Sequence, residues 1–264
     1  MNYVRVVGGL GNQMFQYTFS KFIEEVFGIR ACLHLDYFED IKSEPTADFR
    51  EFGLDRMRTG FESVYGEVAC SQIINEEDDW HEKLQAIDGL YFNGYWQAKK
   101  YYEYVKDIVR SDFELKDEYI TNSMRSIVEE MQSTNSISLH IRRTDYIKEN
   151  ITLKDEYYYK AIDVLRQKIG KNRISVFAFS DDLDYADKLM NNLECESYTI
   201  MPIRPAYQDL YLMSKTKHHI IANSTFSWWG AVLGNSDDSL TVAPLIWFKD
   251  RKSPDIYMND WILI

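Results

Sequence analysis

Five short apolar segments, alternating with segments of helical periodicity, constrain the fold more than any other feature of the chain. The segments predicted as strands lie at 137–141, 174–179, 198–200, 219–222 and 240–243. The predicted helices lie near 157–169, 183–191, 207–214 and 225–233. Strands that alternate with helices of about three turns are typical of a doubly wound parallel sheet. Ligands of such sheets bind beyond the carboxyl ends of the strands, so polar residues there are candidate site residues.

The first half of the chain begins with the same alternation. It reads as a strand at 3–7, a glycine loop at 8–11, a helix at 12–27 and a strand at 31–35. Gly28 stands where this helix should end.

Later segments of the first half are less regular. From 39 to 88 the sequence predicts no firm element, whereas 91–109 predicts a strand and a helix, and 124–131 another helix. A polar STNS segment at 133–136 then interrupts the pattern. We therefore predict an α/β protein of two Rossmann-like domains, 1–132 and 133–264.

Composition excludes some classes of protein. The 42 acidic and 30 basic residues give a net charge of −12, whereas a nucleic-acid surface needs clustered cations. No segment approaches the roughly 20 apolar residues of a membrane span, and the first residues predict a strand rather than a signal peptide. Cys32, Cys70 and Cys195 are too widely spaced for a disulfide framework or a CxxC metal site, which predicts buried thiols. We expect a cytoplasmic protein, and peripheral attachment to the inner face of a membrane stays open.

The first motif is GGLGNQMFQ, between the first strand and the first helix. Gly9 and Gly11 would let the backbone approach a ligand closely, and Asn12 and Gln13 follow at the start of the helix. A dinucleotide fingerprint needs a third glycine, where this chain has methionine. Asp36, in the place of a ribose-binding acid, keeps a nicotinamide-dependent oxidoreductase as an alternative.

The second motif is HIRRTDY, at the end of a predicted buried strand. Alternation along the strand places His140 and Arg142 on one face and Arg143 on the other. A guanidinium fork at a strand end suits a diphosphate, so we predict that Arg142 binds one. For Arg143 we predict a structural ion pair with Asp145. A lone histidine in an apolar strand is more often a core residue than a catalyst, and the sequence does not decide this for His140.

Two further motifs end in polar residues. FSDD delivers Ser180, Asp181 and Asp182 to the edge of the sheet, where one acid is expected to cap the next helix and the other to accept hydrogen bonds from a base or ribose. In IIANSTFSWWGAVL the strand ends, a turn follows, and amides and hydroxyls at the start of a helix form an anion cradle. The residues of this turn and cradle are Asn223, Ser224, Thr225, Phe226 and Ser227. Of Trp228 and Trp229 at least one should be core, since adjacent helical residues point about 100° apart.

With these motifs in order, the chain resembles the bacterial α-1,2-fucosyltransferases of glycosyltransferase family 11. GGLGNQMFQYT, HIRRTDY, FSDD and IIANSTFSWWGAVL carry the resemblance, GYWQAKKYY fits it as well, and together they span nearly the whole chain. The resemblance implies a GT-B fold whose two domains face across a cleft, with GDP-fucose bound mainly by the second domain and the acceptor by the first. It also implies a galactose-terminated acceptor, inversion at the sugar carbon, no metal or other cofactor, and a role in surface polysaccharides such as the O-antigen of lipopolysaccharide.

The resemblance also implies roles for residues. Arg142 would stabilise the departing diphosphate, Asn12 and Gln13 would contact donor or acceptor, and Asp181 or Asp182 would bind the guanine. As the base for the acceptor hydroxyl the candidates are Asp145, Glu149 and His140, and Asp145 is preferred. The predicted donor-binding residues are Gly9, Gly11, Asn12, Gln13, His140, Arg142, Ser180, Asp181, Asp182, Asn223, Ser224, Thr225, Phe226 and Ser227. Thr144 stands where the family usually has glycine. A fucosyltransferase that forms another linkage and a sugar-binding module without catalysis are further alternatives.

Overall fold

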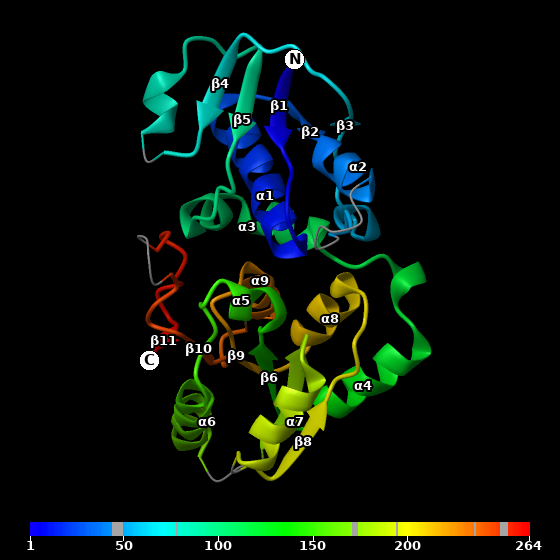
Figure 1. Cartoon of the computed structure of the whole chain (residues 1–264), viewed down its shortest axis with the longest axis vertical. Coiled ribbons are helices and arrows are strands. Elements are labelled where there is room, and N and C mark those ends of the chain that lie inside the picture. Colours follow the sequence, from blue (N-terminus) through cyan, green and yellow to red (C-terminus); the bar gives the residue numbers. More distant parts are fainter. Residues whose placement is uncertain (44–49, 78, 171–173, 194, 235, 249–252) are drawn as a thin grey trace. The chain divides into compact units, whose positions relative to one another are not determined.

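The computed structural model describes residues 1–43, 50–77, 79–170, 174–193, 195–234, 236–248 and 253–264, with the side chains of 40–43 left undescribed. The chain forms two compact units, Met1–Lys116 and Asp117–Ile264 (Figure 1). Each unit is built around a parallel sheet of its own. No helix within the described ranges is long and apolar enough to cross a membrane.

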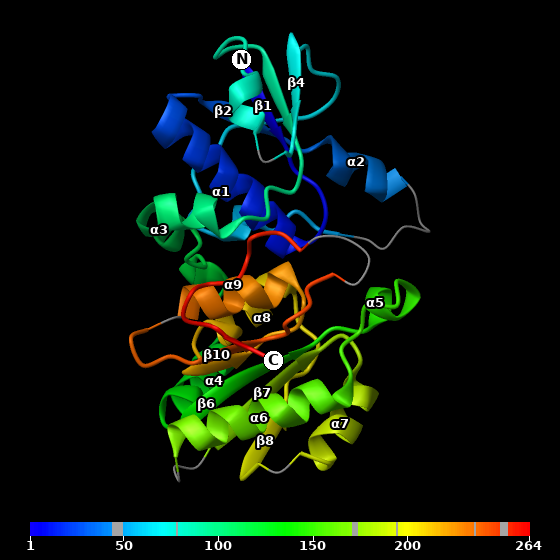
Figure 2. The ribbon, with the colours of Figure 1, turned by 90° about the vertical axis from the view of Figure 1, so that its left-hand side faces the viewer.

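The sheet of the first unit has five strands in the order β3-β2-β1-β5-β4, and every neighbouring pair is parallel. The strands are β1 (Asn2–Arg5), β2 (Ala31–His34), β3 (Ser63–Val64), β4 (Gln72–Asn75) and β5 (Leu90–Asn93). The helices are α1 (Leu10–Phe27), α2 (Asp36–Ser43) and α3 (Lys99–Asp112), with short 3-10 helices at Leu54–Arg56 and Trp80–Lys83. Helix α1 packs on β1 and β2, and α3 packs on α1 (Figure 2).

Apolar periodicity explains why α1 forms and where it packs. Met14, Phe15, Phe19 and Ile23 are fully buried on one side of the helix. Gly28 ends the helix in the left-handed region with φ of 66°, as predicted, and its N–H donates to carbonyls of the last turn. The sequence predicted no firm element at 39–88, so it missed β3, β4 and most of α2, whose polar residues leave little periodic signal.

The sheet of the second unit has six parallel strands in the order β11-β10-β9-β6-β7-β8. The strands are β6 (Asn135–Ile141), β7 (Ile174–Ser180), β8 (Ser197–Ile200), β9 (His218–Ile220), β10 (Thr241–Ala243) and β11 (Ile262–Leu263). The helices are α4 (Asn122–Gln132), α5 (Thr144–Lys148), α6 (Asp155–Ile169), α7 (Leu183–Asn191), α8 (Ala206–Met213) and α9 (Thr225–Gly234), preceded by a 3-10 helix at Asp117–Tyr119.

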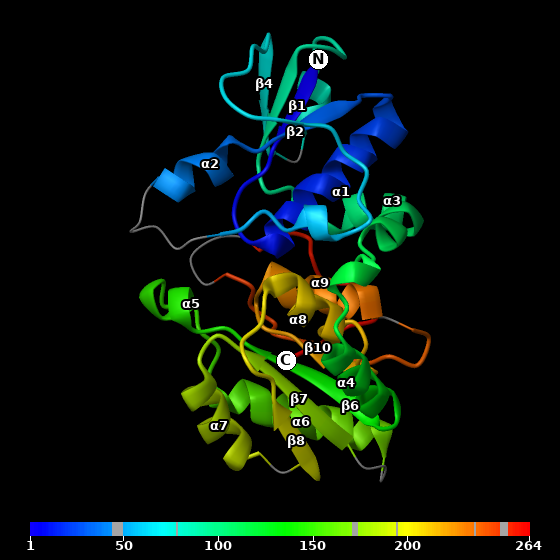
Figure 3. The same ribbon diagram turned by 90° about the vertical axis from the view of Figure 1, so that its right-hand side faces the viewer.

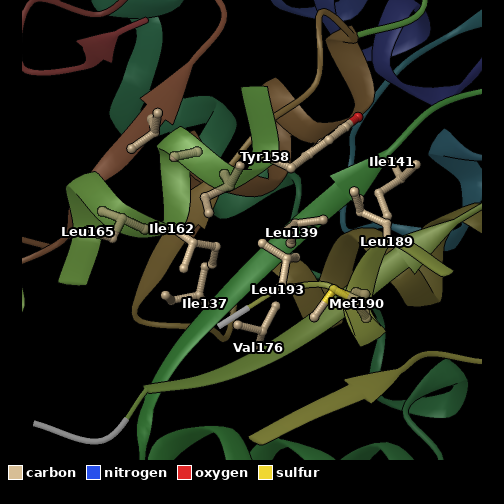
Figure 4. Close-up of a cluster of buried hydrophobic side chains, with 14 of the residues drawn as sticks. Ile137, Leu139, Ile141, Tyr158, Ile162, Leu165, Val176, Leu189, Met190 and Leu193 are labelled. Atoms are coloured by element: carbon tan, nitrogen blue, oxygen red, sulfur yellow. The ribbon is translucent and has the colours of Figure 1, made fainter. Parts of the chain in front are cut away.

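Strand β6 is central in this unit and its apolar residues organise the core. Ile137, Leu139 and Ile141 are fully buried among side chains of α6, α7 and β7 (Figure 4). Burial of a side chain of this kind stabilises the fold by about 1.5–3 kcal/mol. The strand therefore ends at a rigid position, and the polar residues that follow it start from a fixed point.

The five strands predicted in the second half are all present, and the helix predicted at 183–191 has the bounds of α7. The sequence missed the short α5 and β11. The boundary between the units also differs from the predicted one, since it follows Lys116 rather than residue 132. Helix α4 contacts β6 and α8 and so belongs to the second unit (Figure 3). The prediction of buried thiols is confirmed for Cys32 and wrong for Cys70, which is exposed in an irregular segment before β4; Cys195 is half-buried.

Candidate functional site

Three polar segments of the second unit follow strands that are neighbours in its sheet. HIRRTDY follows β6, FSDD ends β7, and the turn at 221–224 follows β9. Because the strands are parallel, their carboxyl ends lie at one edge of the sheet. The structure therefore brings these predicted site segments together, as the sequence indicated.

Arg142 lies between two carboxylates at this edge. Its Nη2 is 2.7 Å from Oδ2 of Asp145, and its Nη1 is 3.0 Å from Oδ2 of Asp181. Burial acts to lower the pKa of Arg142, but the bonds to Asp145 and the charge of Asp181 outweigh it and raise the pKa. The guanidinium is thus charged, about three quarters buried and fixed in orientation at the end of β6.

Asp181 ties the end of β7 to the turn after β6. Its Oδ1 accepts a hydrogen bond from the backbone N–H of Arg143 at 2.9 Å. Its Oδ2 accepts from the backbone N–H of Thr144 at 3.3 Å and from the Thr144 hydroxyl at 2.7 Å. The carboxylate therefore holds both the backbone that carries Arg142 and, through the ion pair, the guanidinium itself.

Arg143 does not form the predicted pair with Asp145. Its Nε is 3.3 Å from Oδ2 of Asp182, and its guanidinium lies over the ring of Tyr185 at 3.6 Å from the centroid. The reason is that α5 begins at Thr144, and a helical turn brings Asp145 back toward Arg142 three residues earlier. Arg143 thus has the structural role that the sequence predicted, with a different partner.

Asp182 is the helix cap that the FSDD motif predicted. Its Oδ1 accepts from the backbone N–H of Tyr185 at 3.0 Å, in the first turn of α7. The Ser180 hydroxyl accepts from the N–H of Asp182 at 3.0 Å and donates to its carbonyl at 3.1 Å. Asp181 and Asp182 therefore both have partners within the second unit.

His140 is buried at the end of β6, with its ring 5.6 Å from that of Phe226. Within the described part of the chain its Nδ1 has no hydrogen-bond partner. Burial, assisted by the charge of Arg142, lowers the pKa of His140 to about 3. The imidazole is therefore neutral near pH 7 and is a weak base.

The turn before α9 is built by bonds that fix its backbone. The side chain of Asn223 donates to the carbonyls of Ile151 at 3.0 Å and Trp247 at 3.2 Å, and its own carbonyl accepts from the Tyr146 hydroxyl at 3.0 Å. The Ser227 hydroxyl donates to the carbonyl of Ser224 at 3.3 Å. This leaves the backbone of Ser224–Ser227 held at the first turn of a helix, where N–H groups favour an anion.

Both tryptophans of this helix are core residues, which confirms the prediction for at least one. Trp228 and Trp229 are 0% exposed, and the indole N–H of Trp228 donates to the carbonyl of Ile256 at 2.6 Å. A sugar could not stack on either ring without opening the core.

The glycine motif lies in the first unit. Gly8 has φ of 80°, and α1 begins at Leu10 with Gly9 as its N-cap, so Gly11 and Asn12 fall inside the helix rather than in a loop. Gln13 is buried; its amide donates to the carbonyls of Gly8 at 3.0 Å and Glu51 at 2.8 Å and accepts from the N–H of Gly53 at 2.9 Å. Gln13 therefore fixes the turn.

Asn12 and Asp36 have different surroundings. The Asn12 side chain, partly exposed, accepts from Gln97 at 3.0 Å. Asp36 lies at the start of α2, and its Oδ1 accepts from the N–H of Gly66 at 2.9 Å. The acid proposed for a nicotinamide ribose is thus part of a local turn. Among the residues described, no three His, Cys, Asp or Glu side chains form a group that could hold a metal ion.

The sequence model of glycosyl transferase family 11 matches residues 1–264. The chain belongs to glycosyltransferase family 11. Two curated relatives come from Escherichia coli. An alpha-1,2-colitosyltransferase is 31% identical, with 98% of this chain and 97% of the relative covered. The O-antigen biosynthesis glycosyltransferase WbnK is 30% identical, with 97% of each covered.

Solved structures share the fold. The fucosyltransferase NodZ from Bradyrhizobium superposes with a TM-score of 0.54 at 14% identity, covering 88% of this chain and 92% of NodZ. Another crystal structure is that of NodZ alpha-1,6-fucosyltransferase soaked with GDP-fucose. An identity this low concerns the fold alone, and it confirms the predicted α/β fold of the GT-B type with two Rossmann-like units. As a family 11 member the chain is a glycosyltransferase, and the oxidoreductase alternative has no support.

Proposed function

We infer that this glycosyltransferase moves L-fucose from GDP-fucose to the 2-hydroxyl of a terminal galactose on an oligosaccharide, with inversion at the sugar carbon. The observation that carries the donor side is the guanidinium of Arg142, held by Asp145 and Asp181 at the carboxyl end of β6. A planar fork of charge-assisted donors suits a diphosphate. The first turn of α9, after the neighbouring strand β9, adds backbone N–H groups for the same anion.

The reaction requires mainly that the protein position the two substrates and stabilise the negative charge on the departing GDP. The bond between the sugar carbon and the β-phosphate oxygen breaks, the acceptor oxygen bonds to that carbon from the opposite side, and its proton passes to a base. GDP leaves with the extra negative charge, which Arg142 stabilises. This supports a reaction without a metal or other cofactor. Asp145 is our candidate base, ahead of Glu149 and of the weakly basic His140.

A second donor has a specific observation in its favour. A relative that matches nearly the whole chain is named as a colitosyltransferase with α-1,2 linkage. Colitose is L-fucose without the 3-hydroxyl, so donors of the two sugars would have the same configuration at the reacting carbon. The linkage in that name supports the 2-hydroxyl as the acceptor position, and the O-antigen relative supports a glycan of surface polysaccharide type.

The first unit contributes in this proposal through the glycine motif. Gly9, half-buried just before α1, leaves room for a ligand to approach, and Asn12 presents a partly exposed amide nearby, whereas Gly11 is buried within the helix. Gln13 acts indirectly by holding the turn. Asp181 or Asp182 as the contact to guanine, and a cytoplasmic location at the inner face of a membrane, stay predictions.

The test offers GDP-fucose and GDP-colitose separately, each with lactose, lacto-N-biose and N-acetyllactosamine, in the presence of a chelator. We expect GDP release and a product with an α-1,2 linkage to galactose from GDP-fucose. Preference for GDP-colitose would correct the donor, and a product of another linkage would correct the acceptor position. Activity that vanishes with the chelator and returns with a divalent cation would overturn the metal-independent mechanism.

A further inference from the structure

The last residues of four neighbouring strands form a polar row at the carboxyl edge of the first sheet. Arg5 of β1 is in register with His34 of β2, and Asn93 of β5 with Asn75 of β4. The preceding pair, Val4 with Phe92, is in register across β1 and β5 and is fully buried. Since side chains alternate, the row lies on the face of the sheet opposite to these core residues.

Hydrogen bonds join Arg5, Asn93 and Asn75 of this row into one array. Nη1 of Arg5 donates to Oδ1 of Asn93 at 3.2 Å, and Nδ2 of Asn93 donates to Oδ1 of Asn75 at 2.9 Å. Arg5 and Asn75 are exposed. A guanidinium carries five N–H donors and a carboxamide two, so the array can offer more donors to a ligand than it uses internally.

Tyr95 stands beside this array on a loop that is held rigidly. Its side chain is 45% exposed. The carboxylate of Glu76 accepts from the N–H of Tyr95 at 2.7 Å and from the N–H of Gln97 at 3.2 Å. Between them Trp96 has φ of 58°, and its buried ring stacks on Phe19 at 3.8 Å.

A positive φ is costly for tryptophan, by about 1–3 kcal/mol, and such strain collects at functional sites. In this strained conformation the loop leaves the side chain of Tyr95 partly exposed and buries the ring of Trp96. The GYWQAKKYY motif contains this loop, and nothing in the donor chemistry of the second unit uses it.

Tyr95 follows Asn93 by two residues, so its loop begins at the end of the strand that carries the array. Tyrosine rings beside amides and a guanidinium are the groups that bind sugars, the rings through their faces and the polar groups through hydroxyls.

We propose that Arg5, Asn75, Asn93 and Tyr95 form the binding surface for the terminal sugars of the acceptor glycan. The surface suits a neutral sugar better than an anion, because the carboxylate of Glu76 lies at the same loop and would repel one. This inference rests on the proposed function and names the residues that would select its acceptor. In it Tyr95 stacks on a sugar ring, while Asn93 and Arg5 bind hydroxyls.

The experiment measures binding of lactose, lacto-N-biose and N-acetyllactosamine by NMR titration, separately from turnover. We expect Tyr95→Ala to raise the dissociation constant of the galactoside that binds most tightly by roughly five- to tenfold. Asn93→Ala should raise this constant by a similar factor. In Tyr95→Phe the constant should stay within about twofold of the wild-type value, because the ring remains. The affinity for GDP should be unchanged in all three variants.

Tyr104→Ala is the matched control, since Tyr104 is 63% exposed on α3, which packs on α1. It should bind galactosides as the wild type does. Unchanged galactoside affinity in both Tyr95→Ala and Asn93→Ala overturns the inference, as does a wild type that binds none of the three sugars. Failure of the proposed function would differ, because galactosides would then bind through Tyr95 while no fucosylated product formed.

Discussion

The guanidinium of Arg142 and the carboxylate of Asp181 are joined by an Nη1–Oδ2 contact of 3.0 Å, from the ends of β6 and β7. The same carboxylate accepts hydrogen bonds from the backbone N–H groups of Arg143 and Thr144, the two residues that follow Arg142. A diphosphate approaching this edge would therefore meet a cation that is already oriented and whose charge two aspartates partly balance. Such preorganisation lowers the cost of reorienting the fork during the reaction.

Arg142→Lys tests whether the fork itself is needed. Lysine keeps the charge but cannot place two parallel donors, so we expect kcat to fall by about 10²–10³, or roughly 3–4 kcal/mol of barrier. The measurement is the rate of GDP release with GDP-fucose and the best galactoside. Arg166→Lys is the control, because Arg166 lies 3.9 Å from Glu196 in an exposed pair of the same unit and should keep wild-type turnover. Near-normal turnover of Arg142→Lys would contradict the donor assignment.

Thr144 offers a milder test of the same arrangement. Its hydroxyl donates to Asp181, so Thr144→Ala should lower kcat/KM about fivefold, the effect of one partly exposed hydrogen bond of about 1 kcal/mol. Thr144→Ser keeps the hydroxyl and should restore most of the loss. The thermal midpoint of both variants should stay near that of wild type. Equal activity of the alanine and serine variants would mean that the hydroxyl does not position Arg142.

Asp145→Asn distinguishes proton transfer from orientation. If Asp145 takes the acceptor proton, kcat should fall by about 10²–10⁴ while the dissociation constant of GDP changes little. Glu149→Gln tests the other carboxylate candidate, which is exposed at the end of α5; with Asp145 as the base, this variant should keep most activity. A loss of GDP affinity as large as the loss of kcat would show instead that Asp145 acts by holding Arg142, to which it is bonded at 2.7 Å.

Most of the second sheet could be predicted because its central strands are buried. Strand β7 is a nearly continuous apolar run and β6 alternates apolar with polar residues, and a sequence displays both patterns directly. The polar residues at the carboxyl ends of these strands were predicted because they stand where the strand patterns end. The first unit was harder: β4 alternates exposed and buried residues over four positions, and half of the residues of α2 are charged. The polar row at Arg5 and Asn93 was missed, because it exists only through the register of strands far apart in sequence.

The spacing of residues along the sequence could not predict which carboxylate each arginine would pair with. Strand alternation assigned Arg142 and Arg143 to different faces, but Asp145 turned toward Arg142 only because α5 starts at Thr144. A helix of five residues leaves little periodic signal. The role of Asp182 as the N-cap of α7 could be predicted, since a carboxylate just before an apolar helical segment commonly accepts hydrogen bonds from the first turn of that helix. The role of Asp181 was not, because its partners come from another strand.

Three buried histidines make the stability of the second unit depend on pH. Burial lowers the pKa of His140 and His219 to about 3 and that of His218 to about 4. Between these values and the unfolded pKa near 6.5, the unfolded chain binds protons that the folded unit does not. The free energy of unfolding is therefore expected to fall as the pH drops below about 6.5, by up to about 1.4 kcal/mol per pH unit for each histidine.

His219→Gln should flatten this slope, because one of the three groups no longer titrates. Its amide can still pair with the hydroxyl of Ser138, which lies 2.8 Å from Nδ1 of His219. Asp209 works in the opposite sense: burial raises its pKa to about 7, so its contribution to stability falls as the pH rises toward 7. Asp209→Asn should accordingly raise the thermal midpoint more at pH 8 than at pH 5. The measurement is thermal unfolding between pH 4 and 8, and a His219→Gln slope equal to that of wild type would show that this histidine is not held neutral by the fold.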